Sequence, residues 1–494
     1  MLLISINNQS KEPIYKQVFH QIKEMIDSGI LKPGDKLPSS RIFSEKLGVN
    51  RTTITKAYEE LWGLGYIESR QGSYSFVRKR TDLANPIIEN KKNLIDWNEK
   101  NSNRIRTLIP DRTNNPWKKT ESGVINFISL SADPRLMPVS EFRKSLNNML
   151  TKGGASLLGY GDPQGYKPLR EFIAEQMQKH CITISAEQII ITQGSQNGIE
   201  LVLKLLVNEG SEVVIESPTY SSAIPLFNYY GAKTIGVSVK DDGMDLDELE
   251  TILQTRKIAL IYTIPNFQNP TGTTTNQAHR ERLLALCEQY KVLLVEDGFQ
   301  EELKYYGKVI LPIKSMDKNE VVIYLGTFSK ILFPGLRIGW IAAAKECISE
   351  LTLIMKSAAL SGNSLDQAAL YSFCRSGYYD LHIKRIHRIY RKRMELTIKT
   401  IKEYFPLEHI TFTKPNGGYT LWFELKNTTE SEDEIIAYLL SNKVAVSPGK
   451  LFYNNTPNGK FFRISIANRD EKEIAQGIQR LGKALTVLYD NEKV

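Results

Sequence analysis

A lysine near the middle of the chain stands among residue types that suit chemistry on an amine. Lys330 follows the apolar run at 321–325, and hydroxyl side chains, Thr327 and Ser329, lie three and one positions before it. Arg337 comes seven positions later. A lysine beyond a buried strand can form a Schiff base with an aldehyde, while hydroxyls and a guanidinium can hold a phosphate. The segment therefore predicts a covalent site for a phosphorylated aldehyde.

Pyridoxal phosphate (PLP) is such an aldehyde, and it needs several further groups. These are a carboxylate at the pyridine nitrogen, a group stacked on the ring, a donor to the ring oxygen and a site for the phosphate. Asp297, Tyr220 and Asn269 each follow an apolar run, at 292–295, 213–216 and 258–262 respectively. We predict that Asp297 keeps the pyridinium protonated, that Tyr220 lies on the ring and that Asn269 bonds the ring oxygen.

A glycine-containing turn is the candidate for the phosphate. Gly194-Ser195-Gln196 comes after a predicted strand at 189–192 and opens a predicted helix at 197–207. The free N–H groups at the start of a helix bind anions. The predicted cofactor site then comprises Lys330, Asp297, Asn269, Tyr220, Ser195, Gln196, Thr327, Ser329 and Arg337.

The elements that must position these residues form an α/β pattern. From residue 124 onward, apolar runs alternate with helical patterns, which predicts a mainly parallel sheet. Ligands of such sheets bind beyond the carboxyl ends of the strands. We therefore expect the candidate residues to meet at one edge.

The front of the chain has a different pattern. Ile14, Val18, Ile22 and Ile26 recur every four residues, which predicts a helix that stops at Gly29. Ser39 or Ser40 can cap a second helix that runs to Leu47, and Asn50 can cap a third from Arg51 to about Leu64. Two short strands around a glycine turn follow at 66–77. This order predicts a winged helix-turn-helix over residues 1–77, a linker over 78–123 and a second domain over 124–494.

The third helix offers polar groups where a recognition helix would meet double-stranded DNA. Arg51, Thr52, Thr53 and Lys56 lie at its N-terminal end. Residues 1–123 hold 21 basic and 14 acidic residues, a net of +7, out of +9 for the whole chain. Basic charge at the front suits DNA contact. Charge alone slightly favours a solvated basic face over a DNA contact.

Composition limits the class of protein. With 494 residues, 41% of them hydrophobic, the chain can build one large domain and one or two small ones. No apolar run approaches the length that spans a bilayer, so we expect a cytoplasmic protein. The four cysteines are far apart, which predicts neither a zinc site nor a disulfide framework.

The front segment resembles the winged helix of the GntR family. The matching residues are Pro33-Gly34, the run Leu37-Pro38-Ser39-Ser40-Arg41, and Arg70-Gln71-Gly72. The resemblance implies that Arg41, Arg51, Arg70 and Gly72 contact DNA. Tyr74 departs from the pattern, which commonly has a second glycine there.

Residues 124–490 resemble the fold-type I aminotransferases of the aspartate aminotransferase family, through Asn269-Pro270-Thr271-Gly272, Ser329-Lys330 with Arg337, and Phe462-Arg463-Ile464-Ser465. The resemblance implies a PLP-dependent transferase fold with a small C-terminal α+β subdomain. It also implies that Arg463 binds a substrate carboxylate. The segment at 160–165 resembles a loop whose tyrosine, here Tyr160, reaches the phosphate of the neighbouring subunit, which implies a homodimer. Phe299 replaces a tyrosine that the enzymes carry two residues after the aspartate.

Together the two halves resemble the MocR-type subgroup of GntR regulators. This implies a PLP-dependent transcriptional regulator that senses an amine, an amino acid or PLP itself. Two alternatives stay open: an active aminotransferase tethered to DNA, and a regulator whose aminotransferase fold has lost its cofactor. Phe299 and the winged helix argue against the first alternative. The intact set of Lys330, Asp297, Asn269 and Arg337 argues against the second.

Overall fold

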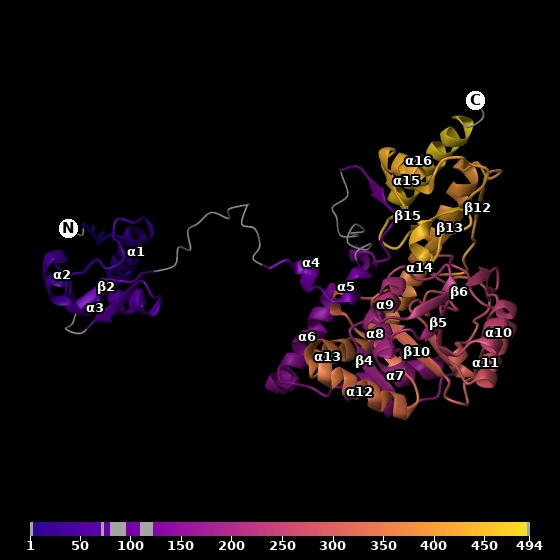
Figure 1. Ribbon diagram of the computed structural model, residues 1–494, viewed down its shortest axis with the longest axis horizontal. Coiled ribbons are helices and arrows are strands. Elements are labelled where there is room, and N and C mark those ends of the chain that lie inside the picture. Colours follow the sequence, from indigo (N-terminus) through magenta and orange to yellow (C-terminus); the bar gives the residue numbers. More distant parts are fainter. Residues whose placement is uncertain (1–2, 71–73, 80–94, 109–121, 492–494) are drawn as a thin grey trace. The chain divides into compact units, whose positions relative to one another are not determined.

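The computed structural model describes residues 3–70, 74–79, 95–108 and 122–491. The chain divides into two compact units, Met1–Lys100 and Asn101–Val494, whose elements are labelled in Figure 1. The division falls inside the segment predicted as a linker. Gly72 and most of that linker lie outside the described residues. Among the described helices, none is long and apolar enough to cross a membrane.

Three helices and a hairpin build the first unit. They are α1 (Ile14–Asp27), α2 (Ser40–Leu47), α3 (Arg51–Gly63), β1 (Ile67–Arg70) and β2 (Tyr74–Val77), and a short α4 (Trp97–Lys100) follows. Ser39 caps α2 by accepting a hydrogen bond from the Ile42 N–H, and Asn50 caps α3 through the Thr52 N–H. Gly48 turns the chain between the helices with a φ of +63°, which glycine adopts without strain.

One apolar core holds this unit together. Val18 and Ile22 of α1 pack with Ile54 and Leu61 of α3, and Val77 closes the core from the hairpin. The apolar positions of both helices recur every three or four residues, so each helix presents one stripe to the core. The predicted winged helix-turn-helix is confirmed.

The second unit is built on an eight-stranded sheet. Its order is β4 (Ile189–Thr192), β11 (Gly339–Ala342), β10 (Val322–Thr327), β9 (Leu293–Asp297), β8 (Ile258–Thr263), β5 (Glu212–Ser217), β6 (Lys233–Lys240) and β7 (Gly243–Met244). The pairs from β10 to β6 are parallel, while β11 and β7 run antiparallel to their neighbours. The sheet is therefore mainly parallel, as predicted.

Helices cover both faces of this sheet. Side chains alternate along each strand, so Val213 and Ile215 of β5 face one core and Val214 faces the other. The first face packs against α8 (Ser195–Leu206), α9 (Ala223–Tyr229) and α12 (Lys345–Ala359). The second face packs against α10 (Leu246–Thr255), α11 (Gln277–Tyr290), α7 (Lys167–Lys179), α13 (Ser364–Arg375) and the long α14 (Tyr378–Tyr404). The helices α5 (Asn103–Arg106) and α6 (Val139–Gly153) precede the sheet in the chain.

A smaller lobe completes the second unit, drawn in yellow and orange in Figure 1. It has an antiparallel sheet of β12 (Ile410–Phe412), β13 (Thr420–Leu425), β16 (Lys460–Ser465) and β15 (Ser447–Pro448), together with α15 (Glu432–Ser441) and α16 (Glu471–Asn491). β14 (Val444–Ala445) pairs with β3 (Ile125–Asn126) from the start of the unit. Phe423 and Phe462, both 0% exposed, stack at the centre of its core. The small α+β subdomain is thus present.

Candidate functional site

Most of the sequence-predicted residues line one cavity at the carboxyl ends of the strands. Lys330 lies three residues beyond β10, next to β9, whose last residue is Asp297. The cavity is lined by Leu130, Ser195, Gln196, Tyr220, Ile264, Asn269, Asp297, Phe299, Ser329, Lys330 and Arg337. Parallel strand order brings these residues together, because the loops after β4, β5, β8, β9 and β10 all leave the same edge.

Lys330 carries an amine of lowered basicity. Burial lowers its pKa to about 8, and the positive charges of Arg463 and Arg337 act in the same direction. Asp297 opposes them. A lysine with this pKa is partly neutral near physiological pH, and the neutral amine is the form that attacks an aldehyde.

Asp297 has one free carboxylate oxygen. Tyr262 donates a hydrogen bond of 2.7 Å to Oδ2, whereas the buried Oδ1 accepts none of normal geometry from any described residue. Burial raises the pKa of this carboxyl to about 6, although the Tyr262 hydroxyl and the Phe299 backbone N–H lower it. A buried acceptor without a donor is costly, and a protonated pyridine nitrogen would satisfy it.

The part of the cavity lined by Ser195, Ser329 and Arg337 suits a phosphate. α8 begins at Ser195, and its first N–H groups have no partner within the helix. Arg337 donates to the Gln193 carbonyl at 3.0 Å and to Ser329 Oγ at 3.4 Å. A Cβ at Gly194 would lie 2.5 Å from Arg337 Nη2 and would displace the guanidinium, and the φ of +84° at this position also favours glycine.

Arg463 lies behind the cavity lining and is bonded to Asn269, which lines the cavity. Arg463 Nη1 donates to Asn269 Oδ1 at 2.9 Å, and Nη2 donates to the Ile128 carbonyl and to Ser447 Oγ. Nε is buried and has no partner among the described residues. Burial lowers the pKa of Arg463 to about 10. A buried cation with an unused donor suits an anionic ligand such as a carboxylate.

Two aromatic residues, Tyr220 and Phe299, also line the cavity. Burial raises the pKa of Tyr220, so its hydroxyl stays neutral. Phe299 is 6% exposed. Phe299 presents no hydroxyl where the aminotransferase resemblance expects one.

A buried network that the sequence did not indicate holds two of the loops. Gln268 Nε2 donates to Glu216 Oε2 at 3.0 Å and to the Pro218 carbonyl at 2.7 Å. Gln268 Oε1 accepts from the Thr271 N–H and hydroxyl. The amide thus makes four hydrogen bonds and ties the loop of Tyr220 to the loop of Asn269. Burial raises the pKa of Glu216 to about 6.

Three predicted residues are not among those that line the cavity: Arg463, Thr327 and Tyr160. Thr327 donates its hydroxyl to the Ile338 carbonyl and accepts from the Ser329 N–H, so it orders the turn before Lys330. Tyr160 is 86% exposed. Its loop is held by a hydrogen bond from the Gly161 N–H to Ser361 Oγ.

The residues present fit PLP. The free oxygen of Asp297 suits the pyridine nitrogen, the buried amine of Lys330 suits the aldehyde, and Ser195, Ser329 and Arg337 suit the phosphate. When bound, PLP supplies an electron sink for bonds at the carbon next to an amine. Asn269 would then hold the ring oxygen, and Arg463 would orient the ligand.

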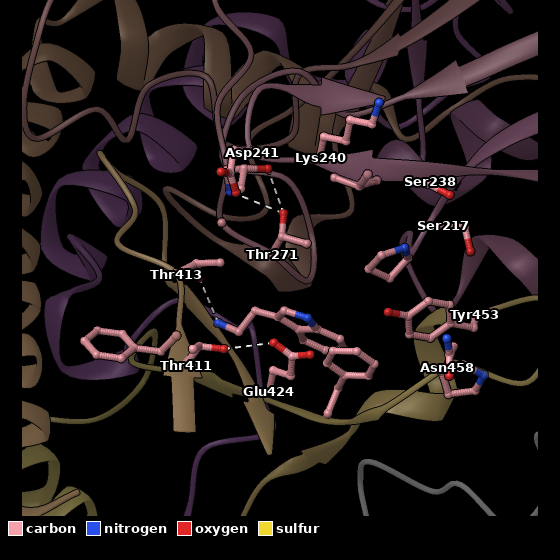
Figure 2. A pocket seen from close by; sticks show the side chains of 18 of the residues that line it. Ser217, Ser238, Lys240, Asp241, Thr271, Thr411, Thr413, Glu424, Tyr453 and Asn458 are labelled. Carbon is pink, nitrogen blue, oxygen red and sulfur yellow. Dashed lines mark hydrogen bonds between the residues drawn. The ribbon is translucent and has the colours of Figure 1, made fainter. Parts of the chain in front are cut away.

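A larger hollow lies elsewhere in the second unit, between the main sheet and the small lobe. It has a volume of about 930 Å³. In Figure 2, Ser217 at the end of β5 and Thr271 of the loop after β8 lie across the hollow from Thr411, Thr413 and Glu424 of the lobe. Thr411 bonds Glu424 at 2.9 Å, and Thr413 accepts from the Trp422 N–H. The hydroxyls of Thr271 and Thr273 bond each other at 2.8 Å. Lys330 is not among the residues that line this hollow.

The candidate DNA-contacting residues lie on the surface of the first unit. Arg41, Arg51, Thr52 and Lys56 are exposed, and Thr53 is half-buried. Ile54 and Leu61 lie on the buried face of the same helix, α3. Arg70 ends β1, and its side chain lies outside the described part of the structure.

Two families match the chain in consecutive segments. The gntR family of bacterial regulatory proteins matches residues 14–77, and the class I and II aminotransferases match residues 127–481.

Individual relatives divide into two kinds. YdcR of Escherichia coli K12, an uncharacterized HTH-type transcriptional regulator, is 30% identical over 472 residues, 95% of this chain and 98% of that protein. MocR of Rhizobium meliloti, named a probable rhizopine catabolism regulatory protein, is 27% identical over 488 residues, 98% and 96% of the two chains. Aromatic-amino-acid aminotransferase 1 of Thermococcus litoralis is 36% identical over 370 residues, 74% and 88% of the chains.

A solved structure matches the second unit. It is LysN, the α-aminoadipate aminotransferase of Thermus thermophilus, in complex with N-(5'-phosphopyridoxyl)-L-leucine. The TM-score is 0.75 at 30% identity, and the match covers 80% of this chain and 100% of LysN.

Proposed function

The chain belongs to the class I and II aminotransferase family and carries a gntR-family DNA-binding domain in front of it, in the MocR-type arrangement, and we propose that it is a transcriptional regulator that senses an amine or amino acid through PLP. One observation carries the proposal: a single chain joins a helix-turn-helix to a cavity that holds Lys330 and Asp297. Such a chain can make DNA binding depend on a small molecule.

The sensing step uses a difference in affinity between two states of the protein. An amine that binds one state better than the other shifts the population by that difference, and a few kcal/mol is sufficient. Arg463 supports a ligand with a carboxylate, since its buried guanidinium has an unused Nε. The proposed effector is therefore an amino acid or an ω-amino acid, with PLP itself as the other possibility.

Phe299 supports sensing over turnover. The ring oxygen of PLP would be bonded by Asn269 but would receive no hydroxyl from position 299. A missing donor changes the basicity of the cofactor, which slows the proton transfers that transamination needs. We propose that the chain retains its ligand rather than releasing product rapidly.

The exposed position of Tyr160 supports a dimer. The side chain is 86% exposed, and exposed apolar side chains, Val139 and Leu158, come from the neighbouring segments. By the family resemblance, Tyr160 completes the phosphate site of a second copy. We propose a homodimer, which would also present two helix-turn-helix units to a DNA site with two halves.

Amino-group transfer is the second candidate function. The residues Lys330, Asp297, Asn269 and Arg463 would all serve it, and the second unit resembles the aminotransferase LysN. Titration with a panel of amines separates the candidates. If the chain is a regulator, the amine that shifts its absorption spectrum also changes its affinity for DNA. If it is an enzyme, it passes the amino group of that amine to a keto acid over many turnovers.

A further inference from the structure

The exposed face of α14 carries a row of basic side chains outside the cofactor cavity. The helix buries Ile386, Tyr390 and Met394 against the cores of the second unit. Its exposed basic residues, which we call the α14 strip, are Lys384, Arg385, Arg388, Arg391, Lys392, Lys399 and Lys402. Two exposed acids, Glu395 and Glu403, lie among them, so the strip carries a net charge of +5.

Most of these cations make no ion pair with another residue that the structure describes. Arg391 pairs with Glu395 at 3.2 Å, and Arg385 lies near Glu141 of α6. For the other five cations of the strip, no ion pair occurs within the described part of the chain. Arg393, which does pair with Asp133 at 2.9 Å, is buried and belongs to the packing of the helix.

The cations are arranged in a line. Lys384, Arg388, Arg391, Lys399 and Lys402 are spaced so that successive members fall within one side of a helix with 3.6 residues per turn. The 18 steps along the helix from Lys384 to Lys402 extend over about 27 Å at 1.5 Å per residue. That length corresponds to about 8 base pairs of DNA at 3.4 Å per pair.

The charge is concentrated on this helix. Residues 124–494 carry a net charge of only +2, so the remainder of that segment is net negative. Lys399 and Lys402 line a hollow of about 520 Å³ that is open to solvent and also contains Glu395 and Glu403. Because these two carboxylates would repel a small anion held there, the linear cationic face suits an extended polyanion better.

We propose that the α14 strip binds the phosphate backbone of duplex DNA, as a second contact in addition to the helix-turn-helix. The inference rests on the proposed function, since the helix-turn-helix brings DNA to the protein. Lysine and arginine contacts to phosphates add affinity without sequence preference. The strip therefore increases the number of phosphates that one protein neutralises.

The salt dependence of DNA binding tests the strip. The full-length chain is titrated against a fluorescent 60-base-pair duplex of random sequence at several KCl concentrations. The strip variant changes Lys384, Lys392, Lys399 and Lys402 to glutamine. The matched control changes four other exposed lysines of the second unit, Lys257, Lys291, Lys308 and Lys318, to glutamine and so removes the same charge.

Each phosphate contact contributes about 0.9 to the slope of log affinity against log salt. The strip variant should therefore lower the slope by about 2 to 4, while the control stays within about 0.5 of the wild type. Equal slopes in the two variants would overturn the proposal. The proposal would also be overturned if the strip variant bound DNA normally but lost binding to vesicles of anionic lipid. It would likewise be overturned if the variant bound DNA normally but changed its oligomeric state, measured as molar mass by light scattering. In the same assay, Arg51→Gln tests the helix-turn-helix alone, so failure of the strip and failure of the proposed function give different results.

Discussion

The Tyr262 hydroxyl donates a hydrogen bond of 2.7 Å to Oδ2 of Asp297 and leaves Oδ1 of that carboxylate free. The pairing fixes the carboxylate plane from one side, so that the other oxygen faces the cavity of Lys330. Tyr262 lies on β8 and Asp297 ends the neighbouring β9, so the geometry depends on the register of these two parallel strands. The register of these strands thus leaves one buried carboxylate oxygen unpaired, which suits the protonated nitrogen of the PLP ring.

Asp297→Asn should change stability and cofactor binding in opposite directions. Burial raises the folded-state pKa from 3.8 to about 6. Below about pH 4 the carboxyl is protonated in both the folded and the unfolded chain. As the pH rises to about 6, the unfolded chain ionises first, so the free energy of unfolding falls by about 2 to 3 kcal/mol, at about 1.4 kcal/mol per pKa unit. Asparagine does not ionise, so the variant avoids this loss.

Urea unfolding of the protein without PLP measures the first effect. The variant should gain stability relative to the wild type at pH 8 and not at pH 4. Its affinity for PLP should fall, because the pyridinium loses its anionic partner. A variant that binds PLP as tightly as the wild type would show that Asp297 does not face the ring nitrogen.

The capture of PLP by Lys330 should depend on pH with a midpoint near 8. Burial and the charges of Arg463 and Arg337 lower the pKa of this amine to about 8, so the reactive neutral form appears well below pH 10. The rate of covalent capture by cofactor-free protein, followed by absorption, should rise through that pH. Arg463→Gln should move the midpoint upward, and Lys330→Ala should abolish capture. A midpoint near 10.5 in the wild type would exclude the buried amine as the reacting group.

Gln268→Met should weaken PLP binding although Gln268 does not line the cavity. The substitution keeps the side-chain length but removes four hydrogen bonds, and each buried group left without a partner costs about 1 to 3 kcal/mol. Tyr220 and Asn269 would no longer be held together. We expect a loss of PLP affinity of about tenfold or more and a changed absorption spectrum of the bound cofactor.

Gln17→Met is the matched control for that substitution. Gln17 is also buried and donates to two backbone carbonyls, those of Asn7 and Glu12, but it belongs to the first unit and lines no part of the cavity. It should cost stability and leave the spectrum unchanged. If both variants altered the spectrum equally, the role of Gln268 would be general packing rather than positioning.

Arg51→Ala should weaken specific DNA binding by about 1 to 3 kcal/mol if the side chain contacts a base edge. Arg51 begins α3 and is exposed, with only a long hydrogen bond to Ser40 Oγ at 3.4 Å. Competition gel shifts with a DNA site selected by the full-length chain measure the effect. Lys11→Ala removes one exposed charge outside α2 and α3 and should change binding much less.

The sequence predicted the helices of the first unit well, because Ser39, Gly48 and Asn50 are local signals at their ends. It also predicted the edge of the sheet where Lys330 and Asp297 meet, since apolar runs mark buried strands. Tyr262 was missed because a tyrosine inside an apolar strand looks like an ordinary core residue. Only the pairing of β8 with β9 brings it beside the carboxylate.

Two further differences have the same origin. Thr327 was grouped with the phosphate site by its distance in sequence, yet its hydroxyl bonds the Ile338 carbonyl in the adjacent segment. Glu216 of β5 and Gln268 of the loop after β8 are 52 positions apart, and nothing local in the sequence indicates that they meet. Tyr160 stays a prediction, because its proposed partner is a second copy of the chain.

The central claim is that one small molecule changes both the cofactor site and DNA binding. The direct measurement is DNA affinity of the PLP-loaded full-length chain across a panel of amines and amino acids, with the absorption spectrum and keto-acid-dependent amino transfer recorded on the same samples. We expect one amine to shift the spectrum and to change DNA affinity, Arg463→Ala to weaken both effects together, and transfer to stay far below ordinary enzyme rates, which are of order 1 per second or more. Transfer at such rates with no effect of any amine on DNA affinity would contradict the account.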